Sequence, residues 1–192
     1  MTPLRATLIT LCSLAATACS DAGHTQQALD EGIDRVSFAT SGRLEIITGD
    51  QPGLVLESED ADALERLRIA VEGDRLTIEQ REAGNWWSWF RGTDIHARVV
   101  LQSVEAVGFA SVGELDVKGV DGAALAVQIA GRADCAIEAL AVNELNVQLA
   151  GAAECSVHGR AARQQQQVAG AGMYRGYGLE TDFYASRNCR RR

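Results

Sequence analysis

The chain has 192 residues, which is enough for one domain or for one domain with a small appendage. Its formal net charge is -8, which argues against nucleic acid as a partner because phosphate binding needs a basic face. Hydrophobic residues make up 46% of the chain but aromatic residues only 5%, so a packed core must rely on Val, Leu, Ile and Ala.

The N-terminus, residues 1–18, is predicted to be an export signal peptide. Arg5 supplies a positive charge, and the apolar run at 6–16 is too short to span a bilayer, which takes roughly 20 residues. Small residues then precede Cys19. This arrangement resembles a bacterial lipoprotein signal, which implies lipidation of Cys19 and, because Ser20 follows it, an outer-membrane location. The alternative is ordinary cleavage before Cys19, which would leave a soluble periplasmic protein.

Residues 19–32 are expected to form the lipid anchor and a flexible tether, because they are small and polar. The folded domain is then expected at 33–180, with an N-terminal β layer at 33–104 and repeats at 105–180. Residues 181–192, which end in Arg190, Arg191 and Arg192, are expected to be a frayed basic tail.

The N-terminal layer shows the alternation of apolar and polar residues that is typical of half-buried strands. A short helix is expected between them, with Asp60 as its N-cap. Gly73 and Asp74 then predict a hairpin. The expected strands lie at 36–39, 44–47, 54–57, 67–71, 76–79 and 96–101.

A cluster of aromatic residues separates the hairpin from the last of these strands. It contains Trp86, Trp87, Trp89 and Phe90, and so holds all three Trp residues of the chain. Flat rings pack on apolar faces, so the cluster could be a binding surface for sugars or membranes. Alternatively, it could fold back and cap the open end of the repeats.

Residues 105–176 repeat with a period of about twenty residues. The segment 127–131 returns as 147–151 and, in shortened form, as 167–170. Self-similarity of this kind is typical of a solenoid, in which each unit packs mainly on its neighbours. We therefore predict an all-β fold, a short β-helix or β-solenoid with coils of about 20 residues.

The repeat also predicts which side chains stack on one another. Gln128, Gln148 and Gln167 are expected to form an outward ladder. The inward columns are expected to be Val107/Val127/Val147, Phe109/Ile129/Leu149/Val168, Leu115/Cys135/Cys155/Tyr174 and Val117/Ile137/Val157.

Two further columns contain side chains that could bind a cation or form a disulfide. Glu114, Asp134 and Glu154 stack as carboxylates, which could bind a cation such as calcium or could sit splayed in water. Cys135 and Cys155 occupy equivalent places about 4.8 Å apart, a spacing that suits either a disulfide or two buried free thiols.

The chain carries no recognisable catalytic motif. His24, His96 and His158 lie in no arrangement that indicates a nucleophile or a metal site, and no Gly-rich phosphate loop is present. We therefore predict no enzymatic activity, no cofactor and no metal. Some polysaccharide lyases and hydrolases are β-helices, with Arg132 and the acidic column as candidates here, but fold analogy is weak support for function.

Three features resemble a bacterial family known as putative autotransporter-adhesin or head GIN domains. They are the segment 42–50, the hairpin at 73–78 and the repeats that end in small-residue corners. Members usually have Gly-Ser-rich corners and further coils, whereas this chain has Ala and Arg at its corners. The resemblance implies a β-solenoid in secreted or lipid-anchored envelope proteins and supplies no catalytic residues.

The expected function is therefore that of a non-enzymatic cell-envelope lipoprotein whose surface serves binding, adhesion or scaffolding. It would touch the membrane through its N-terminal anchor and could have a protein or glycan partner. The alternative is a periplasmic β-helix protein that binds or cleaves polysaccharide.

The two interpretations of the aromatic cluster predict different outcomes for Trp87→Ala. If the cluster caps the repeats, the variant should fail to fold, because a large buried ring costs about 3 to 5 kcal/mol to remove. If the cluster binds a ligand, the melting temperature should stay within about 2 °C of wild type while binding is lost. Thermal denaturation followed by circular dichroism separates the two.

Overall fold

The computed structural model describes residues 23–81, 94–176 and 178–189. Within these residues the only helix is α1 (Ala61–Glu65), and the predicted all-β class is confirmed. The first seven strands are β1 (Gly23–Ala28), β2 (Arg35–Ala39), β3 (Gly42–Thr48), β4 (Gly53–Ser58), β5 (Leu67–Glu72), β6 (Arg75–Gln80) and β7 (Ile95–Leu101). The others are β8 (Ala106–Lys118), β9 (Asp121–Gly151), β10 (Glu154–Gly170), β11 (Met173–Arg175), β12 (Leu179–Glu180) and β13 (Phe183–Cys189).

Local signals account for the short elements near the N-terminus. Asp60 caps α1, and its side chain accepts a hydrogen bond from the backbone N–H of Asp62. Strands β5 and β6 form the predicted antiparallel hairpin, in which Gly73 takes a φ of 63° at the turn. Both sequence predictions are confirmed.

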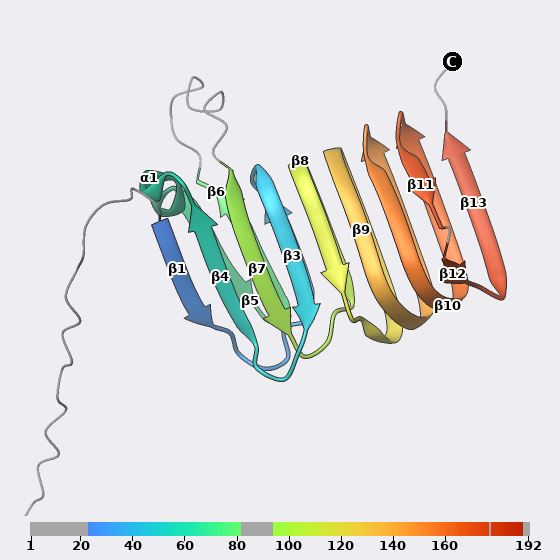
Figure 1. The fold of residues 1–192 in the computed structure, drawn as a ribbon, viewed down its shortest axis with the longest axis horizontal. Helices are drawn as coiled ribbons and strands as arrows, with labels where there is room; N and C mark the ends of the chain where they lie inside the picture. Colours follow the sequence, from blue (N-terminus) through green and yellow to red (C-terminus); the bar gives the residue numbers. More distant parts are fainter. Residues whose placement is uncertain (1–22, 82–93, 177, 190–192) are drawn as a thin grey trace, which may run out of the picture.

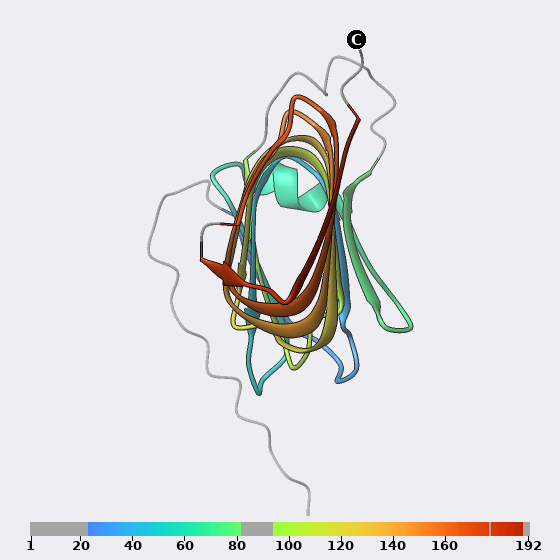
Figure 2. The ribbon, with the colours of Figure 1, turned by 90° about the vertical axis from the view of Figure 1, so that its right-hand side faces the viewer.

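One curled sheet contains all thirteen strands and wraps around the core (Figures 1 and 2). On one side, which we call the front face, β1, β4, β7, β3 and the second half of β8 lie side by side, and parts of β9 and β10 continue the same face. The first half of β8 pairs instead with β2, which leads on to β6 and β5. Strand β8 therefore bends between two sides of the molecule.

Pairing in the C-terminal half is parallel and keeps a nearly constant offset. Val107 of β8 pairs with Val127 of β9, and Asp134 of β9 pairs with Glu154 of β10, an offset of twenty residues. A register shift between Val157 and Gly159 then reduces the offset to nineteen. The period found in the sequence is thus the separation between paired residues.

Equivalent apolar side chains form columns inside the curled sheet, as predicted. Phe38 stacks on Phe109, with ring centroids 5.4 Å apart, and Ile129 continues the column. All the predicted inward residues are buried except Tyr174, which is partly buried. The outward pairing of Gln148 with Gln167 also agrees with the prediction.

Glycine at the corners lets the strands stack this closely. Gly131 and Gly151 have φ values of 128° and 119°, a region that favours glycine. A Cβ on Gly131 would overlap the carbonyl oxygen of Ser111, and one on Gly151 would overlap that of Gly131. Each corner is therefore in direct contact with the corner of the preceding pass of the chain, that is, the stretch about twenty residues earlier with which it pairs.

The core becomes polar toward the C-terminal end. Gln164 pairs in register with buried Leu145, and it is itself only 3% exposed. Its amide nitrogen donates a hydrogen bond to the hydroxyl of Tyr174 at 2.5 Å. Burial raises the pKa of the Tyr174 hydroxyl, so the group stays protonated.

Cys135 and Cys155 are register partners, and both are free and buried. A hydrogen bond with Cys155 is the main cause that raises the pKa of the Cys135 thiol, and burial is the second cause. Of the two alternatives that the sequence left open, the structure contains the buried thiols.

Two sequence predictions are wrong in part. The tether expected at 19–32 includes Gly23–Ala28, which forms β1 and pairs antiparallel with β4. The tail expected at 181–192 includes Phe183–Cys189, which forms β13 and pairs parallel with β10. In both cases backbone pairing with an existing strand orders a segment whose own side chains are mostly exposed.

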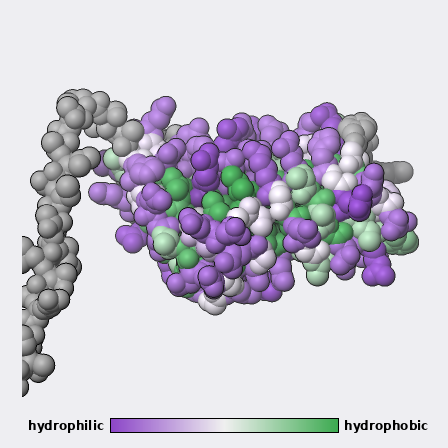
Figure 3. Space-filling view, turned by 60° about the horizontal axis from the view of Figure 1, so that its bottom comes forward, coloured by the Kyte–Doolittle hydropathy of each residue, from purple (hydrophilic) through white to green (hydrophobic). Residues whose placement is uncertain are grey.

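No helix in the described part of the chain is long and apolar enough to cross a membrane. Seen from its lower side, the surface is largely polar, with apolar patches between polar side chains (Figure 3).

The corner packing predicts that Gly151→Ala is strongly destabilising. The backbone strain alone should cost about 1 to 3 kcal/mol, and the overlap with Gly131 should add to it. Gly122→Ala is the matched control, because a Cβ there meets nothing within 4 Å. Urea denaturation should show a lower unfolding free energy for Gly151→Ala only. Equal midpoints for both variants would contradict the corner model.

Candidate functional site

A row of ionisable side chains crosses the front face from strand to strand. Each member is the register partner of the next, so the side chains lie on the same side of the sheet. We call this set the charged row. Its members are His24 (β1), Glu57 (β4), His96 (β7), Arg43 (β3), Glu114 (β8), Asp134 (β9) and Glu154 (β10).

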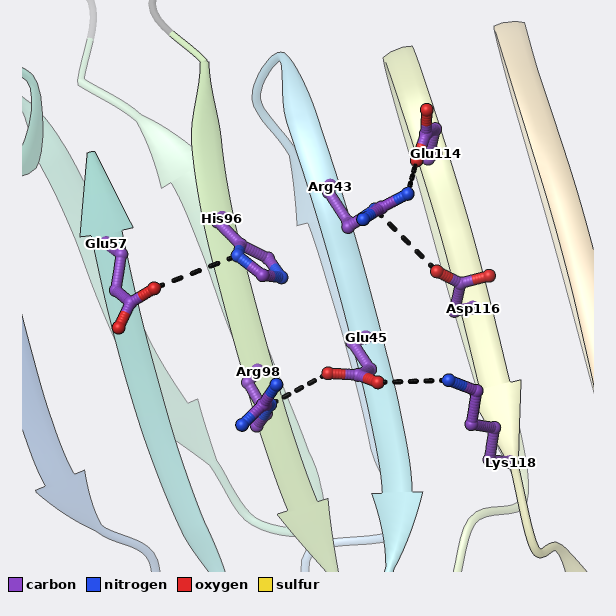
Figure 4. Close-up of polar contacts among 8 residues, drawn as sticks. All are labelled: Arg43, Glu45, Glu57, His96, Arg98, Glu114, Asp116 and Lys118. Carbon is purple, nitrogen blue, oxygen red and sulfur yellow. Dashed lines mark hydrogen bonds and ion pairs between the residues drawn. The ribbon is translucent and has the colours of Figure 1, made fainter. Parts of the chain in front are cut away.

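Beside the row, two residues further along the strands, Glu45 stands at the centre of an ion-pair network (Figure 4). Its carboxylate accepts hydrogen bonds from Arg98 Nε at 2.7 Å and from Lys118 Nζ at 3.1 Å. The hydrogen bond from Arg98 is the main cause that lowers the pKa of the Glu45 carboxyl, against the effect of burial. The hydrogen bond that Lys118 donates to Glu45 raises the pKa of Lys118.

Arginines neutralise both ends of the predicted acidic column. Arg43 pairs with Glu114, and its Nε lies 3.7 Å from Asp116 Oδ2. Figure 4 shows both contacts. Arg175 pairs with Glu154 at the other end. Asp134, between them, is exposed and makes no ion pair with another described residue. The structure thus contains the predicted column of carboxylates, but charge pairing relieves most of the repulsion between them.

The calcium interpretation of this column finds no support. Within the described ranges, no three His, Cys, Asp or Glu side chains are placed to hold one metal ion.

At its β1 end the charged row opens into a groove of about 750 Å³. The Glu57 carboxylate lies between two imidazoles, 3.4 Å from His24 Nδ1 and 3.8 Å from His96 Nδ1. All three side chains are well exposed. The groove wall also includes Arg43, Glu59, Asp94 and Glu114.

Sequence reasoning missed this groove. The three central residues come from strands far apart in the chain, and β4 enters antiparallel between β1 and β7. No local spacing could have indicated it. The one available signal was the acidic column, which predicted three of the seven members of the row.

The row presents carboxylate, imidazole and guanidinium groups side by side on an exposed surface. Such groups bind ionic partners and multiple hydroxyl groups through charge-assisted hydrogen bonds. The other predicted site residues, Cys19, Trp86, Trp87, Trp89 and Phe90, lie outside the described residues.

The network around Glu45 predicts a pH-dependent contribution to stability. A lowered pKa in the folded state means that ionised Glu45 stabilises the fold above its ordinary pKa of 4.5, and that this stabilisation is lost as the pH falls through the lowered value. Glu45→Gln should therefore lower the unfolding free energy at pH 7 by roughly 0.2 to 1 kcal/mol.

Urea denaturation at several pH values tests this. The difference between wild type and Glu45→Gln should stay constant above pH 4.5 and shrink in more acidic solution. Glu144→Gln is the control, because Glu144 is exposed and makes no ion pair with another described residue. A difference that persists in acid would mean that packing, and not charge, holds Glu45 in place.

Solved structures show that this fold occurs elsewhere. The chain is 16% identical to a putative adhesin from Bacteroides fragilis, with a TM-score of 0.72 over 88% of this chain and 78% of that one. It is 11% identical to a putative adhesin from Parabacteroides distasonis, with a TM-score of 0.59 over 87% and 78%. It is 13% identical to a putative lipid binding protein from Parabacteroides distasonis, with a TM-score of 0.57 over 88% and 78%. At these identities the likeness concerns the fold alone.

No curated protein matches the chain. A family model does match it, over residues 33–187, and its description is "Putative auto-transporter adhesin, head GIN domain". The match covers most of the chain and agrees with the resemblance carried by the 42–50 segment, the hairpin and the repeats. The protein therefore belongs to the putative auto-transporter adhesin, head GIN domain family.

Proposed function

We propose that the protein is an exported, non-enzymatic envelope protein that binds a partner surface through the charged row. The observation that carries this proposal is the continuity of the row, which crosses seven neighbouring strands on one exposed face. An extended row of carboxylate, imidazole and guanidinium groups favours contact with another extended polar surface. This fits adhesion or scaffolding better than it fits turnover of a small substrate.

The architecture behind this face is, in our proposal, a short β-solenoid with coils of about twenty residues. Parallel pairing at offsets of twenty and then nineteen residues supports it. The corner glycines support it too, since Gly131 and Gly151 press against equivalent points of successive passes. A solenoid places its outward side chains at regular spacing, which makes it a suitable support for a linear binding surface.

Residues 1–19 support the proposed location. A short positive segment, an apolar run and small residues before Cys19 are typical of an export signal. We propose that Cys19 carries a lipid and holds the protein on the outer membrane. Metabolic labelling with palmitate tests this: Cys19→Ser should lose the label and should appear in the soluble periplasmic fraction. A labelled Cys19→Ser protein would exclude the anchor.

The second candidate function is polysaccharide binding. The groove at the β1 end supports it, because Glu57, Glu59, Asp94 and Arg43 offer hydrogen-bonding groups for hydroxyls around an open volume of about 750 Å³. The aromatic cluster at 86–90 remains a predicted stacking surface for the same ligands. Release of reducing sugars from envelope polysaccharide would show that the protein cleaves polysaccharide as well as binding it.

Binding of the purified domain to isolated envelopes of the producing bacterium tests the main proposal. Asp134→Lys should weaken binding at least about tenfold, because it reverses a charge within the row. Glu144→Lys makes the same change of charge away from the row and should leave binding unaltered. Both variants should keep the wild-type melting temperature, since both residues are exposed.

Equal loss of binding in the two variants would show that net charge, and not the row, controls the contact. Binding that neither substitution changes would place the binding surface elsewhere.

A further inference from the structure

Strand β1 is attached to the sheet almost entirely through its backbone. It pairs with β4 along all six of its residues, and the sheet has no described strand on its other side. Gly23 is partly buried against Leu64 of α1, and the other five residues are exposed. Strand β1 therefore adds backbone hydrogen bonds to the fold but buries no apolar side chain.

Other strands of the same face are attached differently. In β3, Leu44 and Ile46 are completely buried, so opening that strand would expose core side chains to water. Regions that bury little apolar surface open at low free energy while the rest stays folded. Opening of β1 should stop at Leu29 and Ile33, which are 8% and 3% exposed and belong to the core.

One side-chain ion pair joins β1 to the sheet in the described part of the chain. It links His24 with Glu57, whose other oxygen faces His96 at 3.8 Å. Imidazole is the side chain whose ordinary titration changes its charge between pH 5 and 8. Protonation of the His24 ring therefore strengthens its attraction to the Glu57 carboxylate, the contact that holds β1 on the sheet.

The other charged groups around this contact favour the same direction. Glu59 and Asp94 line the groove next to it and attract a protonated imidazole. Helix α1, which packs on β1, carries exposed Asp62 and Glu65. The opposing charges are His96, which repels His24 when both rings are protonated, and Arg43, which is already paired with Glu114 and Asp116.

We propose that β1 is a detachable strap on the front face, fastened by protonation of His24 beside Glu57. When the strap is docked, Gly23 and His24 complete one wall of the groove. When it opens, that wall is lost and the edge of β4 is exposed for pairing with another strand.

Opening would also lengthen the link to the membrane. Six residues of β1 add about 20 Å of extended chain between Cys19 and the folded body. This consequence rests on the proposed lipid anchor, whereas the strap itself does not.

Hydrogen exchange of the full mature chain, carried as Cys19→Ser, tests the strap without the anchor or a binding partner. After correction for intrinsic rates, amides of β1 should be protected at least about 100-fold less than those of β3. Protection of β1 should be about two- to fivefold higher at pH 5.5 than at pH 7.5, the effect expected of one or two exposed ion pairs.

Variants identify the groups responsible. Glu57→Gln and His24→Gln should each remove most of the difference between the two pH values. His158→Gln is the matched control, because His158 is exposed and lies on β10, away from the groove; it should keep the difference. Protection of β1 equal to that of β3 would overturn the strap. A pH dependence that neither substitution reduces would overturn its control by protonation.

These outcomes are independent of the envelope-binding experiment. Loss of the pH effect in a protein that still binds envelopes through Asp134 would remove only the strap. Loss of binding in a protein with an intact pH effect would remove only the proposed function.

Discussion

Backbone pairing between equivalent residues of successive passes is the constraint on which the rest of this structure depends. Once Val107 pairs with Val127, every neighbouring residue must also face its equivalent. Apolar residues then form buried columns, and ionisable residues form rows on the surface. The pairing depends on glycine at tight corners such as Gly131 and Gly151, where a Cβ would collide with the carbonyl of the preceding pass. The buried columns, the surface rows and the glycine corners thus all follow from the same in-register pairing.

The same constraint explains the electrostatics of the front face. Register forces Glu114, Asp134 and Glu154 into one column, although like charges at this spacing repel. The chain compensates by placing Arg43 and Arg175 at the ends of the column. Glu45 shows the reverse arrangement, one carboxylate between two cations. The charges of the face are therefore set by position in the register as much as by composition.

Periodicity made part of the fold predictable from the sequence. The inward columns and the outward glutamines followed from the twenty-residue repeat, because each unit carries its apolar residues at the same places. Strands β1 and β13 could not be found in this way, since Gly23–Ala28 and Phe183–Cys189 have little alternation and order mainly by pairing with a neighbour. Propensity and periodicity are properties of a segment's own sequence. These two segments are ordered by pairing with the edges of β4 and β10, which exist only after folding.

The groove was unpredictable for a related reason. His24, Glu57 and His96 become neighbours only because two antiparallel pairings bring three distant segments together. A sequence shows three isolated ionisable residues, and isolated residues of this kind are usually solvated. The aromatic cluster at 86–90 remains a prediction, because it lies outside the described residues.

The hydrogen bond between buried Gln164 and Tyr174 has a consequence for folding fidelity. Passes that resemble one another so closely could pair one full unit out of place with little loss of apolar contact. A slip that separated Gln164 from Tyr174 would leave the buried amide without its hydroxyl partner, at a cost of about 1 to 3 kcal/mol. The polar pair thus distinguishes the last pass from the similar apolar passes before it.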